Sequence, residues 1–251
     1  MYAIITGASS GIGREMALQL AQKGYHLILV ARREDRLKQL ASYIKELYSV
    51  KVKIAVCDLG NKQACLDFCE TYKNYPVEIL INNAGFGKIG YITETSLEDQ
   101  LSMIDTNIVS LHILSRHFAK QMRKGYILNV ASIAAFQPGP FLATYGATKA
   151  YVAKFSLALG YELKKQHKRI SVTTLCPGPV ATEFDSVAGT NFTLPSISAK
   201  QCALEGLDGM FKRKRLVLPS TAKFAYLAAK FAPLKIVLPV VHFVQKSKTG
   251  K

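Results

Sequence analysis

Near its start the chain reads Thr6-Gly7-Ala8-Ser9-Ser10-Gly11-Ile12-Gly13, directly after the apolar run Tyr2-Ala3-Ile4-Ile5. This order predicts a buried strand, a glycine-rich turn and then a helix over Arg14–Lys23. In such a turn, backbone N–H groups can approach a pyrophosphate, which then lies at the N-terminus of the helix. The spacing is G-x-x-x-G-x-G rather than G-x-G-x-x-G. Taken alone, the motif also fits a tight turn with no ligand.

Short apolar runs alternate with helical patterns along the 251 residues. The expected strands are Ala3–Ile5, Leu27–Val30, Lys53–Cys57, Glu78–Ile81, Tyr126–Val130, Ile170–Leu175 and Leu216–Leu218. The expected longer helices are Glu34–Tyr48, Lys62–Lys73, Leu97–Lys124 and Tyr145–Lys165. This alternation predicts one α/β domain over residues 1–251, a doubly wound, Rossmann-like parallel sheet of about seven strands with helices on both faces. Ligands of such sheets bind beyond the carboxyl ends of the strands.

Composition narrows the class of protein further. The five cysteines are scattered and odd in number, which predicts a reduced cytoplasmic protein without a disulfide framework. The first strand begins at once, so we expect no targeting segment ahead of it. Cys65 and Cys69 are one helical turn apart, but no second pair or nearby histidine completes a zinc site, and no metal is expected.

The net charge is +16, and no Asp or Glu follows Asp208. Such charge suits nucleic acid, anionic lipid or phosphorylated ligands, although a solvated basic face is the plainer interpretation. The chain shows no nucleic-acid-binding module, so we expect no nucleic-acid partner.

The second strand runs into Ala31-Arg32-Arg33. About 20 residues after the glycines, a NAD site carries an Asp or Glu that binds the ribose 2′-OH. Here the arginines offer forked donors that suit a 2′-phosphate instead. This favours NADP(H) as the cofactor; the alternative is that Arg32 and Arg33 merely begin the next helix.

A serine follows the fifth strand at position 132, and Tyr145 and Lys149 come 13 and 17 residues later. Positions four apart lie on one face of a helix. An ammonium group beside a phenol is expected to lower the tyrosine pKa and to make Tyr145 a usable acid or base. Tyr161/Lys165 and Tyr226/Lys230 repeat the spacing without a serine from a strand end, so they are interpreted as ordinary helix-surface pairs.

These motifs together resemble the short-chain dehydrogenase/reductase family, from the first strand to Thr182. The matching segments are Thr6–Gly13, Asp58 after the third strand, Asn82-Asn83-Ala84-Gly85 after the fourth, Asn107, Ser132, Tyr145, Lys149 and Pro177-Gly178-Pro179-Val180-Ala181-Thr182. Their order and spacing are those of the family. After Thr182 the similarity is only architectural.

The resemblance implies a role for each position. Tyr145 would transfer a proton to or from the substrate oxygen, Ser132 would hydrogen-bond that oxygen, and Lys149 would bind the nicotinamide ribose. Asn107 would kink its helix and hold a water that relays protons to Lys149. The implied cofactor contacts are Gly7, Ser9, Ser10, Gly11, Ile12, Gly13, Arg32, Arg33, Asp58, Leu59, Asn83, Ala84, Gly85, Tyr145, Lys149, Pro177, Gly178, Val180 and Thr182. Asp58 would contact adenine, and the turn over 177–182 would hold the nicotinamide amide.

The substrate end is predicted from the loops after strands four, five and six, including a variable region over 183–215. These loops contain Phe86, Phe136, Phe141, Phe184, Phe192, Leu194 and Ile197, with Lys88 and Lys200 as the candidate charged contacts. A hydrophobic ketone, aldehyde or secondary alcohol fits this composition, although loop phenylalanines also serve in local packing.

The C-terminal tail, residues 220–251, is basic and apolar. Lysines, Pro233 and Pro239 make the run Leu234–Val244 a poor membrane span. Such a segment can instead lie weakly at a membrane interface, so the protein is expected to be cytoplasmic and in part peripheral to a membrane. The alternative is that the tail, with Phe224, Leu227, Ala228 and Phe231 on one helical face, packs on the substrate pocket or on a neighbouring subunit.

Two further expectations concern assembly and function. The two long helices carry extra apolar residues, and family members usually pair through them, so a homodimer or homotetramer is predicted. The residues concerned are Leu111, Leu114, Phe118, Tyr151, Phe155 and Leu159. The predicted function is an NADP(H)-dependent oxidoreductase of the CH–OH/C=O class. The alternative is a non-catalytic NADP(H)-binding redox sensor or scaffold on the same fold.

Overall fold

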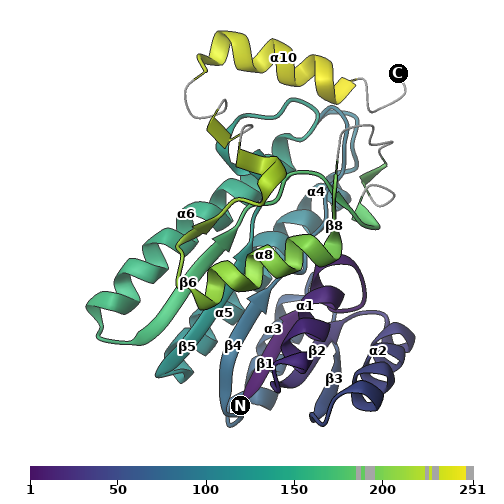
Figure 1. Cartoon of the computed structure of the whole chain (residues 1–251). Coiled ribbons are helices and arrows are strands. Elements are labelled where there is room, and N and C mark those ends of the chain that lie inside the picture. The colour runs from purple at the N-terminus through teal and green to yellow at the C-terminus, as the bar shows by residue number, and fades with distance from the viewer. Residues whose placement is uncertain (185–187, 190–195, 224–225, 228–231, 247–251) are drawn as a thin grey trace.

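A parallel sheet of seven strands forms the centre of the molecule (Figure 1). In this computed structural model residues 1–184, 188–189, 196–223, 226–227 and 232–246 are described. The strands are β1 (Tyr2–Thr6), β2 (His26–Ala31), β3 (Val52–Val56), β4 (Val77–Asn82), β5 (Lys124–Val130), β6 (Arg169–Leu175) and β9 (Leu216–Val217). Their spatial order is β3-β2-β1-β4-β5-β6-β9, and every pairing is parallel. The order reverses between β1 and β4, which is where doubly wound sheets bind ligands.

Helices cover both faces of the sheet. They are α1 (Gly11–Gln22), α2 (Glu34–Leu47), α3 (Lys62–Tyr72), α4 (Leu97–Ile104), α5 (Ser110–Gln121), α6 (Ala143–Lys165), α8 (Ala199–Phe211) and α10 (Leu234–Lys246). Helices α1, α2 and α8 pack on one face, and α3, α5 and α6 pack on the other. Side chains alternate accordingly: Ile5 joins the first core and Ile4 the second. The predicted fold class is therefore confirmed.

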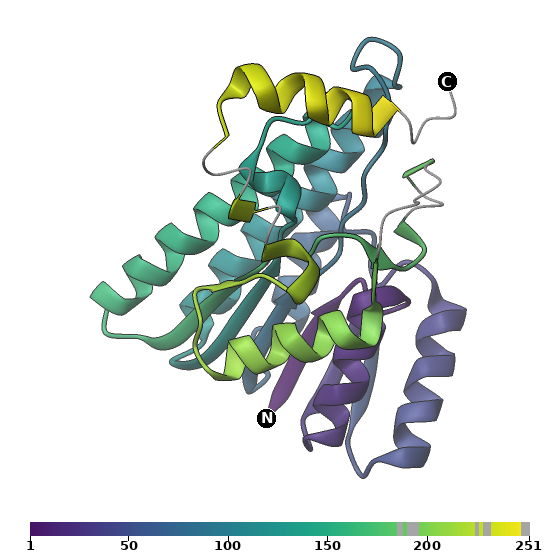
Figure 2. The same cartoon turned by 45° about the horizontal axis from the view of Figure 1, so that its top comes forward.

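Shorter elements connect the sheet to the site. Strands β7 (Val180–Ala181) and β8 (Ile197–Ser198) pair with each other, and η2 (Ile133–Phe136) and η3 (Ser220–Ala222) are single 3₁₀ turns. Helix α10 lies beyond the carboxyl end of the sheet in both views (Figures 1 and 2). The tail thus returns to the end of the sheet where the predicted site residues gather.

The structure differs from the prediction in two segments. The predicted helix Leu97–Lys124 is interrupted by a π-helical turn, η1 (Asp105–Val109), and ends at Gln121 because the chain enters β5 at Lys124. Gly125 allows this entry: it has φ +135°, and a Cβ there would lie 2.1 Å from the Glu78 carbonyl oxygen. The variable region over 183–215, predicted to belong to the substrate loops, contains α8, whose residues Ala203, Leu207 and Met210 pack into the core.

Candidate active site

The glycine-rich turn is fixed by close contacts with the end of β4. The Thr6 hydroxyl accepts hydrogen bonds from the backbone N–H groups of Asn83 and Ala84, at 2.9 and 3.0 Å. The Asn83 amide donates back to the Thr6 carbonyl at 2.9 Å. A Cβ on Gly13 would lie 2.4 Å from the Gly7 carbonyl oxygen, so only glycine fits there. The turn is thus packed against β4, directly above the point where the strand order reverses.

The N-terminus of α1 has the features of an anion site. Gly7 and Gly11 have φ of +65° and +53°, which glycine adopts without strain. Ser10 is the N-cap residue of the helix, but its side chain accepts no hydrogen bond from the helix backbone. The first turn holds no acidic residue. The dipole and backbone N–H groups of this helix end therefore meet no carboxylate from the first turn of the helix. A pyrophosphate group fits this cradle.

The two arginines after β2 take different positions. Arg33 extends over the glycine-rich turn, where its Nη2 donates to Ser10 Oγ at 2.9 Å and to Ser9 Oγ at 3.1 Å. Its Nη1 donates to Glu183 Oε2 at 2.9 Å, and Arg36 binds the other oxygen of the same carboxylate. These two hydrogen bonds hold the pKa of Glu183 at about 2. Arg32 is exposed beside them.

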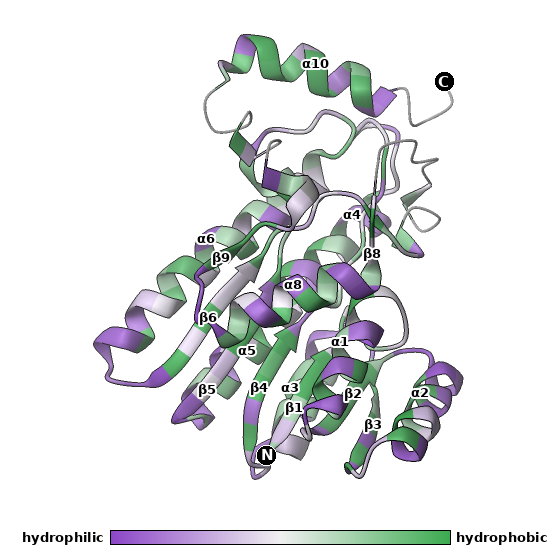
Figure 3. Cartoon of the chain, in the orientation of Figure 1, coloured by the Kyte–Doolittle hydropathy of each residue, from purple (hydrophilic) through white to green (hydrophobic). Residues whose placement is uncertain are grey.

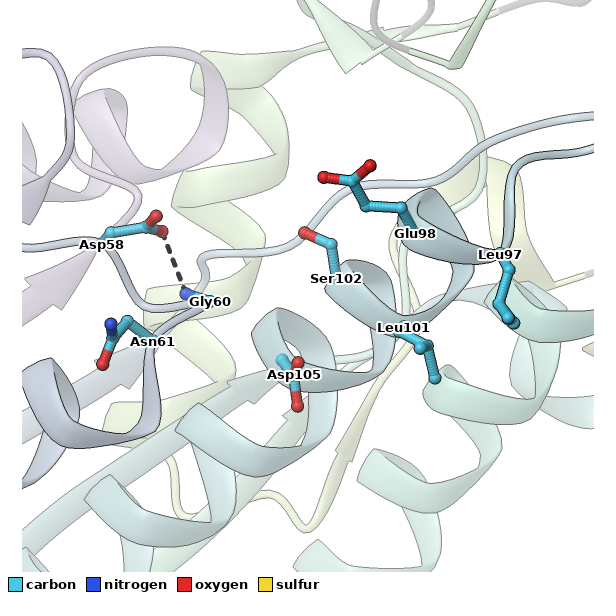
Figure 4. A pocket seen from close by; sticks show the side chains of 8 residues that line it. All are labelled: Asp58, Gly60, Asn61, Leu97, Glu98, Leu101, Ser102 and Asp105. Carbon is cyan, nitrogen blue, oxygen red and sulfur yellow. Dashed lines mark hydrogen bonds between the residues drawn. The ribbon is translucent and has the colours of Figure 1, made fainter.

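Asp58 and Leu59 directly follow β3, at the carboxyl end of the sheet. Asp58 is exposed, and its Oδ1 accepts from the Gly60 N–H at 3.0 Å (Figure 4). The Leu59 side chain is buried in the core, so only its backbone is available to a ligand. A pocket opens beside Asp58, lined by Asp58, Gly60, Asn61, Leu97, Glu98, Leu101, Ser102 and Asp105. None of the predicted catalytic side chains lines it.

The predicted catalytic residues lie together beyond β5, at the start of α6. Ser132 lies close enough to the Tyr145 hydroxyl to lower its pKa, and Lys149 Nζ lies 5.8 Å from the centre of the Tyr145 ring. All three residues are buried. Lys149 Nζ donates to the Val130 carbonyl at 3.0 Å, at the end of the strand. The structure thus brings a hydroxyl, a phenol and an ammonium group into one buried cluster.

The prediction that Lys149 lowers the pKa of Tyr145 is wrong for this structure. Burial raises the pKa of Tyr145 to about 12, and the Ser132 hydrogen bond only partly opposes this. Burial also lowers the pKa of Lys149 to about 8, against a smaller opposing effect of Cys176. Desolvation penalises the charged form of both groups and is the largest influence on both pKa values. The phenol is therefore held neutral, in the form that donates a proton.

Asn107 joins the loop after β4 to the catalytic helix. It lies in the π-helical turn η1, as expected of a residue that kinks its helix. Its Nδ2 donates to the Phe86 carbonyl and to Thr148 Oγ1, both at 3.0 Å, and its Oδ1 accepts from the Phe86 N–H at 3.1 Å. A Cβ on Gly85 would lie 2.7 Å from this Oδ1 and 3.2 Å from Lys149 Nζ. Gly85 thus keeps open the space between these two polar groups.

The loop after β6 crosses the site toward the glycine-rich turn. The Pro177 carbonyl accepts from the Ile133 N–H at 2.9 Å, and Gly178 and Val180 follow it toward β7. The Thr182 methyl would lie 3.2 Å from a Cβ on Gly11. The chain then places Phe184 on Tyr145, with ring centres 5.4 Å apart. This loop therefore contacts both the glycine-rich turn and Tyr145.

Sequence reasoning missed three contacts of this site. Glu183 was not expected to bind Arg33, Thr148 was not expected to bind Asn107, and Phe184 was placed only in a general pocket wall. Glu183 and Phe184 directly follow the Pro177–Thr182 motif, and this position in the sequence was the one signal that they belong to the site. Thr148 gave no signal beyond its place beside Lys149.

The other Tyr-x-x-x-Lys pairs behave differently from Tyr145 and Lys149. Lys165 Nζ lies 5.5 Å from the Tyr161 ring centre, almost the same geometry, but Tyr161 is exposed. Its interpretation as a helix-surface pair is confirmed. Tyr226 instead packs edge-on against Phe136, with centres 4.7 Å apart, and Lys230 lies outside the described residues. Burial and the Ser132 contact distinguish the first pair from its repeats.

The predicted substrate loops are joined to the C-terminal tail. Phe141, with φ +66°, packs against Tyr91 and against His242 of α10, with ring centres 4.4 and 5.1 Å apart. Lys88 pairs with Asp99 at 3.7 Å, and Lys200 is exposed. Phe192, Leu194, Phe224, Ala228 and Phe231 lie outside the described residues. The part of the tail that is described therefore packs on the loops after β4 and β5.

Comparison with known proteins identifies the family. The family model for short chain dehydrogenase matches residues 1–191. The chain belongs to the short-chain dehydrogenase family of oxidoreductases. A short-chain dehydrogenase of Sphingobium yanoikuyae, solved in complex with NADPH, is 31% identical, with a TM-score of 0.83 over 91% of each chain.

Two curated relatives bear on function. The very-long-chain 3-oxoacyl-CoA reductase of Anas platyrhynchos is 32% identical over 226 residues, 87% of this chain and 72% of that protein. The inactive hydroxysteroid dehydrogenase-like protein 1 of Homo sapiens is 34% identical over 197 residues, 76% of this chain and 58% of that protein. The chain spans between about half and about four-fifths of the length of the curated relatives that it matches.

The remaining expectations meet the structure as follows. Leu111, Leu114 and Phe118, which were assigned to a subunit interface, are buried within the single chain, so that part of the oligomer argument is wrong. The other three residues of that prediction are only half-buried, so they can still contribute to a subunit interface. They are Tyr151, Phe155 and Leu159. Within the described ranges, no helix has the length and apolar character to span a bilayer, and no three His, Cys, Asp or Glu side chains gather at metal-binding distance.

Proposed function

We propose that this chain is an NADP(H)-dependent oxidoreductase that reduces a hydrophobic ketone or aldehyde, or oxidises the matching secondary alcohol. The observation that carries the proposal is the buried contact of Ser132 with Tyr145 beside Lys149. The bound cofactor would supply the hydride, while the chain supplies position and a proton. The glycine cradle of α1 fits the pyrophosphate, and Arg32 and Arg33 fit a 2′-phosphate.

Each catalytic side chain has a distinct task. Ser132 would donate a hydrogen bond to the carbonyl oxygen, and Tyr145 Oη would release its proton to that oxygen as the new C–H bond forms. Because burial raises the pKa of Tyr145, the phenol carries the proton that the reductive direction consumes. Lys149 would bind the nicotinamide ribose and return a proton to Tyr145 through the space kept open at Gly85. Asn107 would hold the water of that relay and orient the loop at Phe86.

Two observations support a hydrophobic substrate. The Phe184 ring packs against the Tyr145 ring, so a substrate bound at the phenol would contact an aromatic side chain. The relative from Anas platyrhynchos is named for a long-chain 3-oxoacyl substrate, a ketone carried on an apolar chain. We infer the same broad class for this protein: a ketone with a large apolar substituent.

The second candidate is a non-catalytic NADP(H)-binding sensor or scaffold. The relative named as inactive keeps this candidate open. The two candidates differ in one measurement, the oxidation of NADPH in the presence of ketones and aldehydes graded by apolar size. Turnover with any of them excludes the sensor, whereas NADPH binding without turnover across the series supports it.

The decisive variant is Tyr145→Phe, and the chain provides its own control. Tyr161→Phe removes the same hydroxyl from the same helix, beside a lysine at nearly the same distance. We expect Tyr145→Phe to lose at least about 10²-fold in turnover with NADPH affinity nearly unchanged, and Tyr161→Phe to keep both. Equal activity in the two variants would show that Tyr145 is not the proton donor.

The cofactor preference is tested in the same way. NADPH should bind more tightly than NADH, and Arg32→Ala should narrow the difference, because the guanidinium pairs with the 2′-phosphate. Isothermal titration of both cofactors measures the two affinities. An unchanged preference in Arg32→Ala would assign that role to Arg33 or remove it altogether.

A further inference from the structure

Helix α10 is held on the body of the protein by its inner side. Val237 and Val241, four residues apart, are buried against the body. His242 Nε2 lies 3.3 Å from the Tyr91 hydroxyl, and its ring packs on Phe141. These contacts fix the rotation of the helix about its axis. The opposite side of α10 therefore faces away from the protein in a defined way.

One flank of that outward side is apolar. Ile236, Val240 and Phe243 follow the i, i+4, i+7 spacing of one helix face, and their side chains are 58%, 55% and 75% exposed. Pro239 is also exposed and lies between them. Figure 3 shows the hydrophobic colouring continuing along α10, at the outer edge of the molecule. We call Ile236, Pro239, Val240 and Phe243 the outer face of α10.

Charge selects the partner of this outer face. The helix contains Lys235 and Lys246 and no acidic residue, and no Asp or Glu follows Asp208 in the chain. A second copy docked on this face would bring lysines against lysines, in a protein of net charge +16. Anionic lipid headgroups instead complement Lys235, which directly precedes Ile236, while acyl chains receive the apolar side chains.

The size of the outer face of α10 also favours a lipid surface over a second protein. A helix of 13 residues is about 20 Å long, so one side of it covers about 200 Å². A stable protein–protein interface buries about 800 Å² on each partner. The helix is also shorter than the about 20 residues needed to cross a bilayer. An apolar strip of this length with flanking lysines suits a helix lying in the plane of a membrane interface.

We propose that the outer face of α10 docks on the surface of an anionic lipid bilayer. Docking would turn the carboxyl end of the sheet, with the loops after β4 and β5 on which α10 packs, toward the lipid. If the proposed function holds, an apolar ketone dissolved in the bilayer would reach Tyr145 from that side. The docking itself requires neither cofactor nor substrate, and it can be measured without them.

The chain contains no tryptophan, which provides a direct probe. Phe243→Trp places the single tryptophan of the protein on the outer face, and Leu204→Trp places one at a 53% exposed position on α8. Vesicles of phosphatidylcholine with about one-third phosphatidylserine should shift the Phe243→Trp emission to shorter wavelength, and brominated acyl chains should quench it. Pure phosphatidylcholine, or high salt, should weaken both effects. The Leu204→Trp emission should not change.

Co-sedimentation with the same vesicles gives an independent measurement. The double variant Ile236→Asp/Phe243→Asp should lose on the order of tenfold or more in vesicle binding, while Leu204→Asp should match the parent chain. Thermal unfolding and NADPH binding of each variant confirm that it is folded. Three results would overturn the proposal: no emission shift with anionic vesicles at low salt, equal shifts for both tryptophan positions, or a doubled mass by light scattering that Ile236→Asp/Phe243→Asp abolishes.

Discussion

Replacing Lys149 by methionine should stabilise the protein at neutral pH while removing its activity. Lys149 is buried, and the structure pairs it with a backbone carbonyl rather than with a carboxylate. Burial lowers its pKa from 10.5 to about 8, with a smaller opposing effect of Cys176. That difference corresponds to a cost of about 3 kcal/mol for keeping the ammonium group charged in the folded state. Methionine has a similar length and carries no charge.

The pH dependence follows from the sign of this shift. Below pH 8 the folded and unfolded states both bind the lysine proton, so the full cost is present. Between pH 8 and pH 10.5 the folded state releases the proton first, and at about pH 9.5 the cost falls to about 1 kcal/mol. Loss of the hydrogen bond to Val130 offsets about 1 kcal/mol of the gain. We therefore expect Lys149→Met to be about 2 kcal/mol more stable than the parent chain at pH 7, and about equal at pH 9.5.

Equilibrium urea unfolding at both pH values, at one protein concentration, measures this difference. Buried cysteines such as Cys65, whose pKa burial raises to about 12 with no contribution from Lys149, affect stability above pH 9 in both proteins and cancel when the two are compared at one pH. Lys165→Met, on the exposed part of the same helix, is the control and should change little. Lower stability of Lys149→Met at pH 7, or a difference from the parent that does not vary between the two pH values, would refute the reasoning.

Three further results are expected. Gly13→Ala should abolish NADPH binding and destabilise the fold by about 1–3 kcal/mol, because its Cβ would lie 2.4 Å from a backbone oxygen. Calorimetry measures the binding and thermal unfolding measures the stability. A variant that binds NADPH normally would contradict the assignment of this turn to the pyrophosphate. Glu183→Gln should tighten NADPH binding by about two- to fivefold and leave NADH unchanged, because Arg33 is no longer shared with a carboxylate; equal effects on both cofactors would exclude this explanation. Light scattering should give a dimer or tetramer, and Phe155→Asp, at a half-buried position on α6, should shift it toward the monomer; a monomeric parent chain at micromolar concentration would reject the assembly.

The sequence by itself determined the features that depend on local chemistry. The Thr6–Gly13 turn predicted a strand, a glycine cradle and a helix, because only glycine tolerates the backbone angles and close contacts of such a turn. The alternation of apolar runs predicted the parallel sheet, because each run must bury its side chains between two helical layers. Spacing alone placed Ser132, Tyr145 and Lys149 at one end of that sheet.

Tertiary structure decided how those residues behave. Tyr145/Lys149 and Tyr161/Lys165 share a spacing and nearly a distance, and only the packing of distant segments makes one pair buried and the other exposed. That burial reversed the expected direction of the Tyr145 pKa, since desolvation depends on everything packed around a group and not on its neighbour in sequence. The Arg33–Glu183 pair joins residues 150 positions apart, and the rotation of α10 is set by Tyr91 and Phe141. Contacts of this range arise from the folded arrangement of the whole chain, which no local pattern encodes.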